Sequence, residues 1–161
     1  MAGISSPIKD SFLDYAKREL EASLSFLSAA HWFQEKHLTG IADKFKEQSD
    51  TQMGFFRSIL EYITLRGEPL AIGNPALGAQ EWTDELATFE LFYKLHISLY
   101  QALLDLFRKA REAEDIDAER FLKTLIEKYV VSIDEWEGWF IQAQSYTALP
   151  GLIWHLNKII G

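Results

Sequence analysis

The sequence contains no cysteine, so it forms no disulfide and offers no thiolate for catalysis or metal binding. It also lacks an apolar run of transmembrane length, and its N-terminus does not have the basic-then-apolar form of a secretory signal. These absences fit a reducing compartment. The expected location is therefore the cytoplasm, or an organelle stroma after processing.

Positive charge is scarce as well, because 24 acidic residues outnumber 16 lysines and arginines and leave a net charge of −8. A surface that binds phosphates should be basic, so neither nucleic acid nor an anionic membrane is expected as a partner. Hydrophobic residues make up 48% of the chain and aromatic residues 14%, which excludes a disordered protein. At 161 residues the chain is expected to be one domain, spanning 1–161.

Apolar residues recur at helical spacing through most of the chain. The pattern predicts four long helices and a short fifth one, over about residues 8–37, 41–66, 83–112, 118–145 and 151–160. Thr83 is the expected N-cap of the third helix, and Asp115 or Asp117 that of the fourth.

The breaks between these helices differ in length. Only Thr39-Gly40 separates the first two helices, so they should be antiparallel neighbours. About sixteen residues rich in glycine and proline, from Gly67 on, separate the second from the third and should run the length of the domain. The expected fold is therefore all-α: a four-helix bundle with one long crossover between the second and third helices and a short C-terminal fifth helix, a topology typical of ferritin-like folds.

Two polar residues interrupt the apolar stripes of the first two helices. Glu19 shares its stripe with Phe12 and Phe26, and Gln52 shares its own with Phe45 and Phe55. Burying a carboxylate or an amide without a partner costs on the order of a few kcal/mol, so both positions require an explanation. The explanations considered are a metal site, the remains of one, or ordinary core polarity.

At this point the chain resembles the ferritin family, of the non-haem bacterial or plant kind. The resemblance extends over nearly the whole chain and is carried by Glu19-Leu20-Glu21-Ala22-Ser23, Phe45, Glu47, Tyr62, Arg66-Gly67 and the terminal segment 152–158. It implies a hollow cage of two dozen subunits that takes in ferrous iron, oxidises it at a di-iron centre in each bundle, and stores ferric mineral.

The residues that match the ligands of that centre depart from the family pattern. Glu19 matches the glutamate of the first helix, but the Glu-x-x-His of the second helix falls on Gln52-x-x-Phe55. The third-helix glutamate falls on His96, and the fourth-helix ligands fall near Ile133 and Trp136. Hard iron prefers several oxygen ligands, so the ferroxidase centre is expected to be degenerate. The favoured interpretation is a hydrogen-bonded cluster of Glu19, His96 and Gln52, and the alternative is a weak site for one divalent ion on the same residues.

The resemblance suggests further candidates. Met53 falls where bacterioferritins carry a haem-ligating methionine, but non-haem ferritins also have methionine there, so no haem is expected. Glu47 and Asp50 are candidates for an acidic inner surface. Asp115 and Asp117 lie at the turn that lines the entry channels of the resembling cages, where carboxylates would concentrate cations.

The sequence therefore predicts a structural or storage subunit of an iron-storage cage, without ferrous oxidation of its own. Iron is the one cofactor considered, either as stored mineral or at a weak site. The expected partners are copies of the chain itself or an active ferritin paralogue. The alternatives are a ferroxidase with rearranged ligands that include Glu19 and His96, and a bundle repurposed as a non-iron interaction protein.

Overall fold

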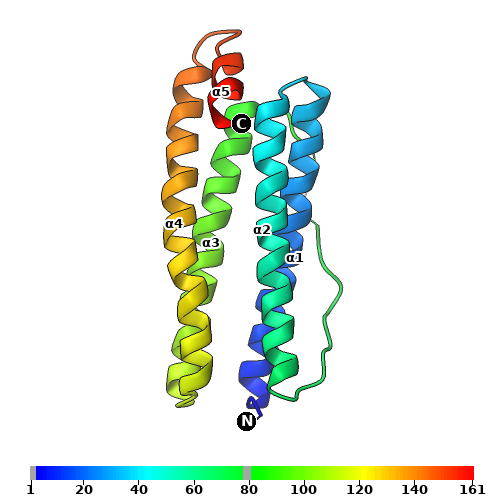
Figure 1. The fold of residues 1–161 in the computed structure, drawn as a ribbon, viewed down its shortest axis with the longest axis vertical. Helices are drawn as coiled ribbons and strands as arrows, with labels where there is room; N and C mark the ends of the chain where they lie inside the picture. The colour runs from blue at the N-terminus through cyan, green and yellow to red at the C-terminus, as the bar shows by residue number, and fades with distance from the viewer. Residues whose placement is uncertain (1–2, 78–80) are drawn as a thin grey trace.

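The computed structural model describes residues 3–77 and 81–161, and within these the chain folds into five helices and no strand. Four long helices form the bundle: α1 (Ser6–Glu35), α2 (Thr39–Leu65), α3 (Glu85–Glu112) and α4 (Ile116–Tyr146). The short helix α5 (Ile153–Ile160) sits against one end of it (Figure 1). The predicted all-α bundle with a fifth helix is confirmed.

The helices pack as two antiparallel pairs, α1 with α2 and α3 with α4 (Figure 1). The segment between α2 and α3 travels from one end of the molecule to the other along the outside of α1, as the long spacing predicts. Two hydrogen bonds tie it to α1: Ala76 N–H donates to Glu21 Oε1, and Trp82 Nε1 donates to Ser28 Oγ. Part of the predicted loop, including Gly78, lies outside the described residues.

The predicted helix starts each differ from the structure by two residues. Helix α2 begins at Thr39, so the predicted break Thr39-Gly40 lies inside the helix and residues 36–38 form the turn instead. Helix α4 begins at Ile116 and α5 at Ile153, against the predicted 118 and 151.

The N-cap of α3 is Asp84 rather than Thr83, because the Asp84 side chain accepts a hydrogen bond from Leu86 N–H. Helix α1 begins at Ser6, two residues earlier than predicted, with Pro7 in its first turn, where the missing N–H of proline costs nothing. The expected cap of α4 is confirmed as Asp115, which accepts from Ala118 N–H.

Aromatic residues fill the half of the bundle nearest α5. The indole of Trp136 is fully buried and packs against Phe26 and Phe45, with ring centroids 5.3 and 5.1 Å away. The other half of the core consists mainly of leucine, isoleucine, alanine and tyrosine side chains. Buried polar residues lie where the two halves meet. His96 among them contacts Tyr129 of one half and Trp136 of the other, so the core itself encloses the candidate site. No helix of the described residues is long and apolar enough to cross a membrane.

Helix α5 is fixed to the beginning of α2. Leu156 and Ile160 are buried, and Asn157 Oδ1 accepts a hydrogen bond of 3.0 Å from Ile41 N–H in the first turn of α2. About half of the Trp154 and Ile159 side chains remains exposed. The expectation that symmetry mates bury this apolar surface stays a prediction.

Candidate functional site

The carboxylate of Glu19 is completely buried in the middle of the bundle, and three side chains donate hydrogen bonds to it. The Tyr15 hydroxyl donates to Oε1 at 2.6 Å, and the Tyr129 hydroxyl donates to the same oxygen. Gln52 Nε2 donates to Oε2 at 3.0 Å. Both oxygens of the buried acid are therefore occupied by donors from α1, α2 and α4.

The hydrogen bonds continue across the core. Gln52 Nε2 also donates to the Tyr129 hydroxyl at 2.8 Å, and Gln48 Nε2 donates to Gln52 Oε1 at 2.6 Å. Trp136 Nε1 donates to Gln48 Oε1 at 3.1 Å. We refer to Tyr15, Glu19, Gln48, Gln52, Tyr129 and Trp136 as the polar network. A connected network of this kind holds its members in one arrangement, because any change at one donor leaves a buried neighbour unpaired.

His96 lies beside the polar network but is not part of it. Its Nδ1 donates to the Phe92 carbonyl at 2.9 Å, and its ring stacks on Trp136 with centroids 5.5 Å apart. Its Nε2 is buried and has no hydrogen-bond partner. The expected Glu19–His96–Gln52 cluster is thus correct for Glu19 and Gln52 and wrong for His96, whose helical position favours the backbone carbonyl one turn earlier.

Burial shifts the pKa values of these groups in opposite directions. It raises the pKa of Glu19 from 4.5 to about 7, although the hydrogen bonds from Tyr129 and Tyr15 partly oppose the shift. Burial lowers the pKa of His96 from 6.5 to about 4, so its imidazole is neutral at neutral pH. Burial and the neighbouring Glu19 raise the pKa of both tyrosines, which therefore stay protonated as donors.

The side chains that surround Glu19 are neutral hydrogen-bond donors. A di-iron site needs several anionic oxygens, whereas Gln52 supplies a neutral amide and Tyr129 a protonated phenol. Across residues 3–77 and 81–161, no three His, Cys, Asp or Glu side chains are grouped closely enough to hold a metal ion. Phe55 falls where the family's Glu-x-x-His pattern has its histidine. The centroid of its ring lies 5.3 Å from that of the Tyr129 ring.

Sequence reasoning missed Tyr15, Gln48 and Tyr129. Tyr15 precedes Glu19 by four residues and Gln48 precedes Gln52 by four, so the helical repeat could have placed both on the buried faces. To find Tyr129 from the sequence, the alignment of the fourth helix with the family pattern must be known. That alignment places the family's ligand positions near Ile133 and Trp136. The structure buries Trp136 fully but leaves Ile133 partly exposed.

The predicted channel acids Asp115 and Asp117 are both engaged by Arg66 at the end of α2. Arg66 Nη2 lies 2.9 Å from Asp115 Oδ2, and Nη1 lies 3.2 Å from Asp117 Oδ2. The Tyr62 hydroxyl donates to the same Asp117 oxygen at 2.8 Å. These contacts clamp the α3–α4 turn to α2 and neutralise part of its negative charge. The proposed role of these acids in cation entry stays a prediction.

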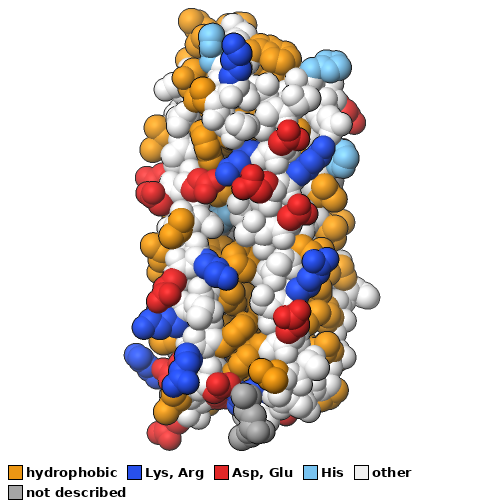
Figure 2. Space-filling view, viewed as in Figure 1, with side chains coloured by type: hydrophobic (Ala, Val, Ile, Leu, Met, Phe, Trp, Pro, Cys, Tyr) orange, Lys and Arg blue, Asp and Glu red, His pale blue; other side chains and the backbone are white. Residues whose placement is uncertain are grey.

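The other predicted positions lie on the outer face of α2. Glu47 and Asp50 are exposed, and Glu47 is 3.7 Å from Lys44, which also pairs with Glu135 at 2.5 Å. Figure 2 shows acidic and basic side chains interspersed over this side of the molecule, with apolar side chains between them. Met53 is partly exposed on the same helix.

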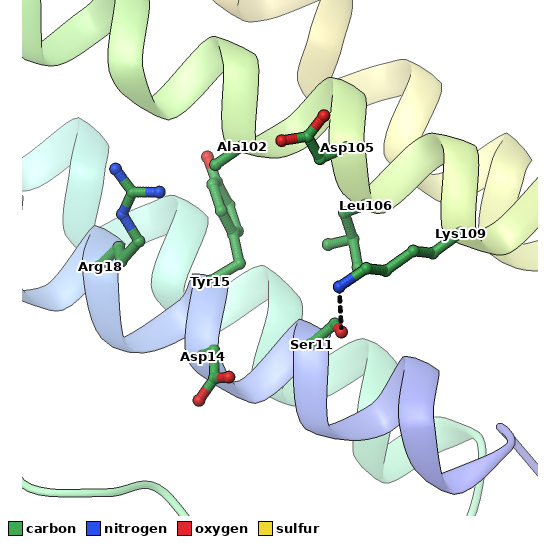
Figure 3. Close-up of a pocket in the computed structure, with 8 residues that line it drawn as sticks. All are labelled: Ser11, Asp14, Tyr15, Arg18, Ala102, Asp105, Leu106 and Lys109. Carbon is green, nitrogen blue, oxygen red and sulfur yellow. Dashed lines mark hydrogen bonds between the residues drawn. The ribbon is translucent and has the colours of Figure 1, made fainter.

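One surface pocket reaches the polar network. It lies between α1 and α3, has a volume of about 180 Å³, and is shown in Figure 3. Tyr15 points across it from α1 towards Ala102, between the side chains of Arg18 and Lys109. Because the Tyr15 hydroxyl binds Glu19 on its inner side, this tyrosine separates the buried carboxylate from the surface.

Comparisons with known proteins agree on the fold. The model of the ferritin-like domain family matches residues 13–143. The soma ferritin of Lymnaea stagnalis is 29% identical over 121 residues, which are 73% of this chain and 70% of that protein.

Solved structures give the same result. An open-pore ferritin from Archaeoglobus fulgidus superposes with a TM-score of 0.94 at 18% identity, covering 99% of this chain and 98% of that one. A variant of PmFTN soaked in iron superposes with a TM-score of 0.90 at 21% identity, covering 95% and 99% of the two chains. At such identities the likeness establishes the fold and leaves the site to be argued from its own residues.

Proposed function

Because the chain belongs to the ferritin-like domain family, we propose that it is an iron-storage subunit that does not oxidise ferrous iron itself. It assembles with copies of itself, or with an active paralogue, into a shell. Ferrous iron is oxidised by other subunits or by oxygen in solution. This chain forms part of the shell and of its inner surface.

The observation that carries this proposal is the saturation of Glu19. Tyr15 and Tyr129 donate to one of its oxygens and Gln52 to the other, so a metal ion would have to displace buried hydrogen bonds to reach it. Each displaced donor would be left unpaired in the core, at a cost of about 1–3 kcal/mol. The polar network therefore links the helices by hydrogen bonds at the position where the resembling family has its di-iron centre.

The test is oxygen consumption after aerobic addition of ferrous iron to the purified assembly, sized beforehand by native mass spectrometry. We expect a closed shell and an oxidation rate equal to that of buffer, because the described residues offer no group of His, Cys, Asp or Glu ligands that could hold a metal ion. The variant Glu19→Gln is the matched control, since it removes the buried carboxylate at the centre of the polar network and should leave the rate unchanged.

Two outcomes would contradict the proposal. Rapid, stoichiometric oxygen consumption that Glu19→Gln abolishes would show a working centre. A monomer or dimer at all protein concentrations would exclude self-assembly. The same result after mixing with an active ferritin paralogue would contradict co-assembly as well and favour a repurposed, non-iron bundle.

A second function, a ferroxidase with rearranged ligands, is favoured by one observation at His96. Its Nδ1–H donates to the Phe92 carbonyl, which leaves the lone pair of Nε2 bare and without a partner. Metal-binding histidines commonly have this arrangement, with the second nitrogen held by a carbonyl. On this alternative, Glu19 gives up its hydrogen bonds and joins His96 around a single ion.

A further inference from the structure

A second pocket lies where the end of the crossover meets the last turns of α1. It has a volume of about 390 Å³ and is lined by Ser28, His31, Trp32, Glu35 and Trp82. Four of its lining residues, Ser28, His31, Trp32 and Glu35, belong to α1, and Trp82 approaches from the crossover. We refer to it as the tryptophan pocket.

Both indole rings of the tryptophan pocket are held in place. Trp82 Nε1 donates to Ser28 Oγ at 3.0 Å, and the Trp82 ring lies 5.4 Å from the buried ring of Phe92. The Trp32 ring packs against Phe33, with centroids 4.9 Å apart. Two large side chains, each only partly buried, therefore form walls that need no rearrangement to receive a ligand.

The charged group of the pocket is an acid without a partner. Glu35 is exposed and forms no hydrogen bond or ion pair within the described part of the chain. Its neighbour in sequence, Lys36, pairs instead with Glu85 at 2.5 Å. Glu35 and the faces of the two indole rings present negative potential to the pocket, and the charge of the nearby Lys36 ammonium is offset by its ion pair with Glu85.

The chain itself provides a cation at this place. Lys36 Nζ lies 4.6 Å from the centroid of the Trp32 ring. That distance is within the range of a cation–π interaction. Lys36 is not among the residues that line the pocket, so its ammonium contacts Trp32 without filling the space between the two tryptophans.

We propose that the tryptophan pocket binds an organic ammonium ion, either a quaternary amine or a protonated alkylamine, between Trp32 and Trp82 with Glu35 as counter-ion. Indole faces are the best aromatic partners for such ions, and their methyl groups are apolar enough to contact the rings directly. This proposal is independent of the one for iron, because the pocket shares no residue with the polar network.

A bound metal ion is the less favourable occupant. His31 and Glu35 are four residues apart on α1 and could supply two ligands, but no third His, Cys, Asp or Glu of the described residues joins them. A purely apolar ligand would give the carboxylate no role. The combination of aromatic walls and one free acid therefore selects an ammonium ion over both.

The experiment is saturation-transfer NMR with tetramethylammonium and tert-butanol in the same tube. The two molecules have similar size and shape and differ in charge, and ligand-observed signals remain sharp for a large assembly. We expect saturable transfer to tetramethylammonium with a dissociation constant on the order of millimolar, as an exposed cation–π site allows, and little transfer to tert-butanol.

Three variants assign the signal. Trp82→Leu should remove most of it, and Glu35→Gln should weaken binding by about two- to five-fold through loss of the counter-ion. Glu112→Gln removes an exposed acid at the end of α3 and controls for unspecific attraction by the net charge, so it should leave binding unchanged. Glu35 is exposed, so its variant remains decisive if Trp82→Leu folds poorly.

Equal transfer to both molecules would overturn the proposal. So would tetramethylammonium binding that Glu35→Gln and Glu112→Gln reduce to the same extent, since that result would mean a diffuse attraction to an acidic protein.

Discussion

Replacing Gly40 with alanine should detach helix α5 from the bundle. A Cβ atom at this position would lie 2.0 Å from the backbone carbonyl oxygen of Asn157, far inside contact distance and against backbone that cannot rotate away. The clash would expose Leu156 and Ile160, whose burial is worth roughly 1.5–3 kcal/mol each. We expect Gly40→Ala to lower the free energy of unfolding by about 3–6 kcal/mol, measured by urea denaturation.

The matched control is Gly138→Ala in α4. A Cβ at Gly138 would meet nothing within 4 Å beyond its chain neighbours and its own helical backbone, so the substitution brings only the helix preference of alanine, roughly 0.5–1 kcal/mol of stabilisation. Equal stability of Gly40→Ala and Gly138→Ala would show that α5 does not depend on the close approach at Gly40.

The second large effect concerns the free energy of unfolding, to which the buried Glu19 and His96 contribute with opposite pH dependences. The pKa of Glu19 is raised from 4.5 to about 7, so its contribution to stability is complete below pH 4.5 and is lost as the pH rises to about 7. The pKa of His96 is lowered from 6.5 to about 4, so its contribution is complete above pH 6.5 and is lost as the pH falls to about 4. Each change amounts to about 3 kcal/mol.

These contributions oppose one another between pH 4.5 and 6.5, and single substitutions should separate them. The variant Glu19→Gln lacks the loss of stability that ionisation of Glu19 causes as the pH rises. The free energy of unfolding of this variant should therefore rise more steeply between pH 4.5 and 7 than that of the natural chain. The variant His96→Phe lacks the gain in stability that His96 gives as the pH rises from about 4 to 6.5. The free energy of unfolding of this variant should therefore fall more steeply over that range than that of the natural chain. The measurement is urea denaturation of the natural chain and both variants across pH 4–8. Three parallel profiles would mean that neither group titrates in the core.

The sequence was sufficient for the fold because the fold depends on long-range patterns. Helical spacing of apolar residues and one long break rich in glycine and proline predicted the bundle, its crossover and the fifth helix. The misplaced cap of α3 reflects the opposite situation: Thr83 and Asp84 are adjacent and both suit an N-cap, so only the local backbone decides between them.

The site was less predictable because it depends on which side chains meet across the core. Glu19 and Gln52 stood out as polar residues on apolar stripes, and the structure joins them at 3.0 Å. Tyr129 could not be recognised in this way, because tyrosine is common on buried helix faces and the sequence does not show which group its hydroxyl binds. His96 faces the core as expected, but helical geometry offers it the carbonyl of Phe92 in place of Glu19.

The proposed function requires that hydrogen bonds, rather than a metal ion, occupy the middle of the bundle. Crystals soaked anaerobically in ferrous iron and measured at the iron absorption edge test it directly. We expect no anomalous peak within bonding distance of Glu19 or His96, and an unchanged set of contacts from Tyr15, Tyr129 and Gln52 to the Glu19 carboxylate. An anomalous peak bonded to Glu19 and to His96 Nε2 would contradict it and establish the rearranged centre instead.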